Sequence, residues 1–173
     1  MTSSDFRVSV RPARDEDGEF ILALVPRLME FGPPPWYDAA RMVATDLETI
    51  GGWLKESPAG TAFFVAEDDE GTRLGFIHLN STVDYFTREE VGHVSDVVVA
   101  PGAEGRGAGR ALMAAAEEWA RGRGYRLLTL NAFSRNTRAR RLYERLGYGE
   151  DMVKYVKELR RPEGPEPDRR EGC

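Results

Sequence analysis

The sequence predicts a single α/β (α+β) domain in which about four helices flank a mixed central sheet of six to seven strands. Its length of 173 residues suits one domain. Strand-like and helix-like segments follow one another along the chain, and one apolar strand runs through a glycine-rich turn into a helix. We expect the domain to occupy residues 1–160, and residues 161–173, which lack large apolar side chains, to form a flexible tail.

The first sixty residues are expected to supply one strand and two helices. Phe6 to Val10 alternates apolar and polar residues, which predicts a half-buried strand. Apolar residues recur at helical spacing over 20–28, until Gly32 and three prolines end the helix. A second helix is predicted from Asp38 to Leu54, interrupted or finished at Gly51-Gly52.

The remaining elements build most of the sheet. A polar turn joins two strand-like runs into an antiparallel hairpin, and the next strand holds a continuous apolar run typical of a strand covered on both faces. In order, the expected elements are strands at 61–66, 74–83 and 93–100, a helix at 108–123, a strand at 127–133, a helix at 137–146 and a last strand at 148–158.

Composition excludes several classes of protein. The formal net charge of −5 argues against a broad nucleic-acid interface, and no apolar run approaches the length of a membrane span. The N-terminus carries no secretory signal pattern, so we expect a cytoplasmic protein. Cys173 is the single cysteine, which leaves no internal disulfide, no cysteine metal site and no thiol nucleophile within the fold, and we expect no metal. The oligomeric state, a homodimer included, stays open.

The most informative segment joins the apolar strand at Val97 to Val99 with the helix that starts near Ala108. Its glycines, Gly105, Gly107 and Gly109, permit unusual dihedral angles and close approach of a ligand to the backbone. Free N–H groups in the first turn of a helix bind anions such as a diphosphate. The chain lacks GxxxxGK[ST], and Arg110 stands where a dinucleotide fold has its third glycine. A simple tight turn is the alternative interpretation.

A second motif, N-x-x-A-x-x-L-Y, runs from Asn136 to Tyr143. The two motifs, in this order and separated by one strand, resemble the GNAT acyltransferase superfamily, whose coenzyme loop is [Q/R]-x-x-G-x-[G/A]. The resemblance implies acetyl-CoA as co-substrate and direct acetyl transfer to an amine. One position departs from the family pattern, because Glu104 stands where most members have Gln or Arg. We expect its carboxylate to point into solvent.

The resemblance also implies the residues that bind the coenzyme. The pantetheine arm is expected along the main chain of the apolar strand, whose side chains can equally be simple core. Asn136 is expected to hydrogen-bond the arm, with a helix N-cap as the alternative. The full expected set is Val97, Val98, Val99, Glu104, Gly105, Arg106, Gly107, Ala108, Gly109, Arg110, Asn136 and Tyr143.

Three residues are the catalytic candidates. Tyr143 matches the family tyrosine that protonates the departing thiolate, with packing on a helix as the alternative. An ammonium must lose a proton before it attacks, so a base is required. His93 is placed by strand alternation on the same face as Val97 and Val99, and Asp96, on the other face, is the second choice. A solvent-facing role for His93 stays open, and His78 is expected to be structural.

The acceptor is expected to be the primary amine of a small molecule. Aromatic residues beside carboxylates hold cations well, and the expected binding residues are Trp36, Tyr37, Tyr85 and Phe86, with core or dimer packing as the alternative. Two other functions stay open: acetylation of a protein N-terminus or lysine, and non-catalytic CoA sensing.

Overall fold

The fold was analysed in a computed structural model of the chain, which describes residues 7–159. The sheet strands are β1 (Ser9–Pro12), β2 (Thr61–Glu67), β3 (Arg73–Val83), β4 (Glu90–Val99) and β5 (Leu128–Leu130). The helices are α1 (Gly18–Leu24), α2 (Ala39–Glu56), α3 (Ala108–Gly122) and α4 (Thr137–Arg145), with short 3-10 turns η1 (Asp15–Asp17) and η2 (Val25–Met29). No helix in this range is long and apolar enough to cross a membrane.

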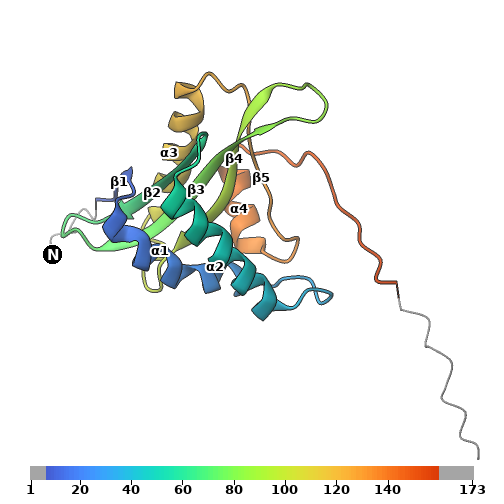
Figure 1. Ribbon diagram of the computed structural model, residues 1–173, viewed down its shortest axis with the longest axis horizontal. Helices are drawn as coiled ribbons and strands as arrows, with labels where there is room; N and C mark the ends of the chain where they lie inside the picture. Colours follow the sequence, from blue (N-terminus) through green and yellow to red (C-terminus); the bar gives the residue numbers. More distant parts are fainter. Residues whose placement is uncertain (1–6, 160–173) are drawn as a thin grey trace, which may run out of the picture.

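The five strands form one mixed sheet in the order β1-β2-β3-β4-β5 (Figure 1). Strands β1 to β4 pair antiparallel, while β4 and β5 are parallel because α3 connects them. This confirms the predicted single α/β domain with a mixed sheet, although the strand count is lower than expected.

The two faces of the sheet carry separate cores. On one face α3 buries Leu112, Met113 and Ala116 against β2, β3 and β4, and Tyr143 and Leu146 of α4 pack against the same cluster. On the other face α1 and α2 bury Ile21, Ile50 and their neighbours against Val65, Phe76 and Val98. Continuous apolar runs in β3 and β4 follow from this cover on both sides.

Helix boundaries differ from the predictions at two places. The first helix ends at Leu24 and continues as the 3-10 turn η2, because Pro26 lacks the N–H that an α-helix needs. Helix α2 passes through Gly51-Gly52 and ends at Glu56, and its C-cap Ser57 has a left-handed φ of 44°. A Cβ on Gly51 would lie 3.8 Å from Leu22 Cδ2, an ordinary contact distance, so Gly51 lies on the side of α2 that packs on α1.

The strand predicted over 148–158 is absent, and this prediction was wrong for a single chain. Residues 150–159 are exposed and carry no secondary structure. In Figure 1 the segment leaves the body of the molecule and runs away from it. A strand requires a neighbouring strand for its backbone hydrogen bonds, and this segment has none among the described residues. The predicted tail, 161–173, lies outside the described residues.

Strand β4 contains a β-bulge at Ser95. Leu79 of β3 pairs with Val94, whereas the preceding residue His78 pairs with Asp96, so Ser95 is the extra residue. Its hydroxyl donates to Asn80 Oδ1 at 2.8 Å. A bulge shifts side-chain alternation by one position, which changes the face on which the earlier residues of β4 lie.

Candidate active site

The glycine-rich turn presents unpaired backbone amides at the start of α3. Gly105 and Gly107 have φ angles of 77° and 89°, which L-residues rarely adopt. No side chain caps the helix, and its first backbone hydrogen bond runs from Ala111 N–H to the Gly107 carbonyl at 3.0 Å. The amides of residues 108–110 therefore lack acceptors in the described chain, as an anion site requires.

Gly109 does not adopt the unusual dihedral angles predicted for it, because its φ is not in the left-handed region. A Cβ there would lie 3.5 Å from Leu142 Cδ2 and 3.6 Å from Val99 Cγ2, which are ordinary contact distances. The start of α3 therefore lies close to both β4 and α4, so the helix that carries Tyr143 is next to the turn.

Strands β4 and β5 separate immediately beyond the bulge. They pair only at Gly92↔Leu128, His93↔Thr129 and Val94↔Leu130. Among residues 7–159, no strand lies beside the edge of β4 that would face β5 from Ser95 to Val99, whereas the other edge of this stretch pairs with β3. Free main-chain groups therefore line a seam that ends at the uncapped start of α3.

Helix α4 carries Asn136 at its start and packs Tyr143 in the same core cluster as Val97 and Val99 of β4. Asn136 is the N-cap, because its Oδ1 accepts from the Ala139 amide at 3.1 Å, as in the alternative interpretation of this residue. Tyr143 is half-buried against the α3-side core, with its ring centroid 6.1 Å from that of Tyr148. Burial raises the pKa of the Tyr143 phenol, so it stays protonated at neutral pH.

The bulge places His93 and Asp96 on one face, which corrects the predicted alternation. Val94, Val97 and Val99 pack in the α3-side core, and Val98 packs in the α1/α2-side core. His93 alternates with Val94 and Asp96 with Val97, so both point toward the α1/α2 side. Regular alternation along the strand predicts His93 on the face of Val97, because it does not count Ser95 as an extra residue.

The His93 ring is half-buried, with Nδ1 2.8 Å from Thr129 Oγ1. Burial lowers the pKa of His93, while the negative charge of Asp96 acts in the opposite direction. The imidazole is therefore neutral at pH 7 and able to accept a proton.

A fully buried histidine holds Asp96, and sequence reasoning missed this contact. His78 Nδ1 lies 2.8 Å from Asp96 Oδ2 across the β3–β4 pair. The His78 ring stacks on Phe63 at 4.3 Å between centroids and meets the edge of Trp53 at 4.5 Å. Its Nε2 is buried and has no hydrogen-bond partner within the described part of the chain. This ring therefore fixes the orientation of the Asp96 carboxylate.

Asp46 on α2 is the second acidic group near β4, and it was not predicted. The neighbouring charge of Asp96 and burial together raise the pKa of Asp46, with burial the larger cause. Four residues separate it from Met42, so the two share one face of α2. The sequence does offer one signal for Asp46: it is a carboxylate on a helix face whose other residues, Met42 and Trp53, are apolar.

Glu104 is paired rather than directed into solvent, which corrects the prediction. Its Oε1 accepts from Arg27 Nη2 of η2 at 2.6 Å. Backbone N–H groups of the turn, at Glu104 itself and Gly102, and then the charges of Arg27 and Arg138, lower the pKa of this carboxyl group. The carboxylate thus stays ionised and is fixed close to the amides of the turn. Arg106 pairs with Asp68 at 3.7 Å, and Arg110 is exposed.

The predicted substrate-binding aromatics fall into two separate groups. Trp36 and Tyr37 line an open hollow of about 420 Å³ at the start of α2, together with Asp38, Arg41, Met42 and Thr45. Tyr85 and Phe86 lie in the loop between β3 and β4, more than 70% exposed, at 73% and 72%. Figure 1 places this loop far from the segment before α2. The structure therefore does not bring the two groups together.

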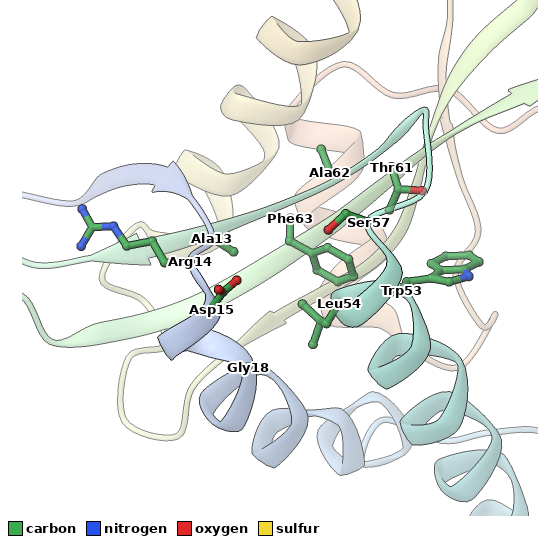
Figure 2. A pocket seen from close by; sticks show the side chains of 10 residues that line it. All are labelled: Ala13, Arg14, Asp15, Gly18, Trp53, Leu54, Ser57, Thr61, Ala62 and Phe63. Atoms are coloured by element: carbon green, nitrogen blue, oxygen red, sulfur yellow. The ribbon is translucent and has the colours of Figure 1, made fainter.

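A second cavity, of about 150 Å³, lies between the end of α2 and the start of β2 (Figure 2). Trp53 and Phe63 line it, and the same two rings enclose His78. Asp15 and Arg14 stand at its other side. The residues that line this cavity are far in sequence from the glycine-rich turn. They matter for the site because two of them, Trp53 and Phe63, hold the His78 ring in place.

Comparison with known proteins agrees with this arrangement. Residues 23–148 match the model of the acetyltransferase (GNAT) family. The chain is 30% identical over 146 residues to YhfO of Bacillus subtilis, an uncharacterized N-acetyltransferase, covering 83% of this chain and 91% of the relative. It is 37% identical over 103 residues to the mycothiol acetyltransferase of Rhodococcus erythropolis, covering 60% of this chain and 34% of that protein.

Solved structures share the fold. A GCN5-related N-acetyltransferase from Ralstonia eutropha superposes with a TM-score of 0.67 at 23% identity, covering 87% of this chain and 99% of that one. The aminoglycoside N-acetyltransferase AAC(6')-Iy, solved in complex with CoA, superposes with a TM-score of 0.66 at 22% identity, covering 91% and 99%. The chain therefore belongs to the acetyltransferase (GNAT) family and is an N-acetyltransferase.

Proposed function

We propose that this enzyme moves an acetyl group from acetyl-CoA directly to the primary amine of a small cationic molecule. The observation that carries the proposal is the seam between β4 and β5, which opens at Ser95 beside the uncapped start of α3. One end of this seam offers amides to an anion, and the other end lies beside His93 and Asp96. A thioester carrier with a diphosphate at one end and a reactive acyl group at the other fits this order.

The binding part of the proposal assigns the diphosphate to the amides of residues 105–110. The main chain of Val97 to Val99 would hold the pantetheine arm and polarise the acyl oxygen through its N–H groups. Bound acetyl-CoA supplies the activated acyl group. The unpaired amides at the start of α3 and the open edge of β4 both fit acetyl-CoA. Each offers backbone hydrogen-bond donors that would otherwise bind only water.

The catalytic part assigns the protons. His93, neutral at pH 7, takes a proton from the substrate ammonium, directly or through water. The amine then attacks the acyl carbon, and the C–S bond breaks. Tyr143 donates its phenolic proton to the departing thiolate, which its raised pKa allows because the phenol remains protonated until needed. The nitrogen loses its second proton as the amide forms, and this proton returns through water to the Tyr143 phenolate. Asp96, fixed by His78, holds negative charge beside His93 and favours the imidazolium that forms.

The acceptor assignment follows from α2. Met42 lines the hollow with Trp36 and Tyr37, and Asp46 follows one turn later on the same face. Aromatic rings and carboxylates attract a cation, and the hollow volume is in the usual range for small ligands, roughly 300–1,000 Å³. Acetylation of a protein N-terminus or lysine is the alternative acceptor class. The fixed Glu104 carboxylate is the one feature that favours non-catalytic CoA sensing.

Tyr143→Phe tests the catalytic assignment. We expect kcat to fall about 100-fold or more, since a positioned acid contributes roughly 10²–10⁴, while the Kd for CoA changes little. Tyr148→Phe is the matched control, because its hydroxyl is also buried in the same aromatic pair but has no partner. Equal loss of turnover in both variants would mean that Tyr143 only packs.

A screen of amines measures thiol release from acetyl-CoA. Turnover with small diamines or aminated sugars, and none with peptides, supports the proposed acceptor class. Turnover only with peptides would favour the protein acceptor. Binding of CoA by calorimetry without turnover on any amine would favour the sensor, and absence of CoA binding would overturn the whole proposal.

A further inference from the structure

Thr129 is the polar side chain of β5, and the fold places it beside His93. Strand β5 consists of Leu128, Thr129 and Leu130. Its parallel register with β4 pairs Thr129 directly with His93. The two strands separate after the next pair, Val94↔Leu130, so the Thr129 hydroxyl lies where the seam between them begins. The acetyl transfer proposed above uses His93 and gives Thr129 no role.

Two contacts of the Thr129 hydroxyl decide where its own hydrogen points. Its Oγ1 lies 2.8 Å from His93 Nδ1 and 3.3 Å from the main-chain carbonyl oxygen of Gly92. A threonine hydroxyl has one hydrogen to donate and two lone pairs that accept, whereas a carbonyl oxygen only accepts. Both contacts are hydrogen bonds only if the hydroxyl donates to Gly92 and accepts from His93. His93 Nδ1 therefore carries a hydrogen.

The second ring nitrogen of His93 is left without a hydrogen. Burial lowers the pKa of His93, so the ring is neutral at pH 7 and carries a single N–H. With that hydrogen on Nδ1, Nε2 keeps a free lone pair. Within residues 7–159 no group hydrogen-bonds to Nε2, so its lone pair is available to a bound molecule.

We propose that Thr129 is a positioning residue that holds the hydrogen of His93 on Nδ1, which makes Nε2 the atom that takes the proton from the substrate ammonium. This role rests on the proposed acetyl transfer. When the ammonium gives its proton to Nε2, the ring becomes an imidazolium whose Nδ1–H stays on Thr129. The Nε2 proton then leaves to water, because the other hydrogen is still bound by the hydroxyl, and the ring returns to the same tautomer.

Nitrogen NMR of the two histidine rings tests the tautomer without any substrate. At pH 8, with signals assigned by their loss in His93→Gln, we expect a pyrrole-type shift for Nδ1 of His93 and a pyridine-type shift for Nε2. Thr129→Val removes the acceptor and should mix or reverse the two shifts, because nothing then holds the hydrogen on Nδ1. Thr129→Ser keeps a hydroxyl and should restore them. Opposite shifts in the parent, or unchanged shifts in Thr129→Val, would overturn the proposal.

Turnover shows whether the tautomer matters for the reaction. Thr129→Val should lower kcat about tenfold, less than loss of a whole general base, which contributes roughly 10²–10⁴, while the Kd for CoA stays unchanged. Thr129→Ser should restore kcat. Thr82→Val makes the same change at an exposed residue of β3 and should alter neither the shifts nor the rate. A changed tautomer with an unchanged kcat would refute the positioning role.

The same variants separate this inference from the proposed function. A fully active His93→Gln variant would show that the base assigned under the proposed function is wrong, whereas the NMR shifts would still decide the tautomer. If His93→Gln loses activity but Thr129→Val keeps all of it, the proposed base stands and the role of Thr129 falls.

Discussion

At the scale of single residues, we expect the pH dependence of the proposed acetyl transfer to come from the pair His93 and Asp96. Four titratable groups meet there: Asp46 from α2, His78 from β3, and His93 and Asp96 from β4. Burial holds the pKa of His93 below 6.5, and Asp96 partly offsets this effect. Loss of the Asp96 charge would therefore lower the pKa of His93 further, because the imidazolium would lose its nearest negative neighbour.

Asp96→Asn should consequently move the acidic limb of the kcat/KM profile to lower pH, with activity retained at pH 7 or above. His93→Gln should abolish this limb. If Asp96→Asn removes the limb together with the activity, the roles are reversed and Asp96 is the base. His78→Gln removes a neighbour that lowers the pKa of His93, so it should move the limb to higher pH, opposite to Asp96→Asn, whereas a purely structural histidine would change only the melting temperature.

Glu104 is the residue that departs most from the coenzyme loop of the family. Its carboxylate is fixed beside the amides that would hold a diphosphate, and like charges repel. Glu104→Gln should therefore bind CoA several-fold more tightly by calorimetry, with the difference reduced at high salt. Glu117→Gln, on the outer side of α3 in an i,i+4 pair with Arg121, is the control and should leave the affinity unchanged. Weaker binding by Glu104→Gln would show instead that its bond to Arg27 shapes the turn.

At the scale of elements, the strand–turn–helix from β4 to α3 depends on backbone geometry at Gly107. This residue is the N-cap of α3 with φ of 89°. Gly107→Ala should cost roughly 1–2 kcal/mol of stability and weaken CoA binding at least tenfold, because the amides lose their arrangement. Gly124→Ala introduces similar strain, at φ of 74° beyond the other end of the helix, and should not affect binding. Equal CoA affinity in the Gly107→Ala and Gly124→Ala variants would show that this turn does not bind the coenzyme.

This strand–turn–helix was predictable because its signals are local. The apolar run, the glycines and the residues at helical spacing follow one another directly in the sequence. The Asn136 cap likewise stands directly before its helix. The bulge at Ser95 was not predictable in the same way, because it exists only in the pairing of β4 with β3. His78 and Asp46 reach Asp96 from elements distant in sequence, so no spacing within one segment could reveal them.

At the scale of the whole molecule, one buried carboxylate joins the N-terminal segments to the sheet. Asp17 is completely buried, accepts hydrogen bonds from Arg11 Nη1 at 2.7 Å and from the Arg14 amide at 2.8 Å, and forms an ion pair with Arg73 Nε at 2.8 Å. Arg11 also reaches Glu67 of β2. These contacts, the Arg11 hydrogen bond first, hold the pKa of Asp17 below 3.8.

Asp17→Asn should lower the free energy of unfolding by about 3 kcal/mol at pH 7, because it removes the buried negative charge that both Arg11 and Arg73 contact. The stabilisation comes from a depressed pKa, so it is fully present above about pH 4 and is lost as the pH falls through the pKa of the folded state. Urea unfolding at pH 7 and pH 3 should therefore show a smaller difference between variant and parent at the lower pH. Asp15→Asn in the same turn is exposed and should change neither value.

The last segment shows why a correct local pattern can give a wrong element. Residues 148–158 have the composition of a strand, and the sheet edge that would receive it is present, yet the two do not meet within one chain. Sequence composition indicates what a segment favours. It does not say whether the fold brings a neighbouring strand beside that segment.

The extra residue in β4 decides on which face of the sheet His93 lies. Ser95 has no cross-strand partner of its own in β3, so its deletion would leave the pairs His78↔Asp96 and Leu79↔Val94 in register, and His93 would keep its present face. A chain of unchanged length that paired without the bulge would instead turn His93 toward the aliphatic layer beneath α3 and Val94 to the opposite face. Two relatives that differ in length by one residue at this point can therefore present the same imidazole to the same side of the sheet.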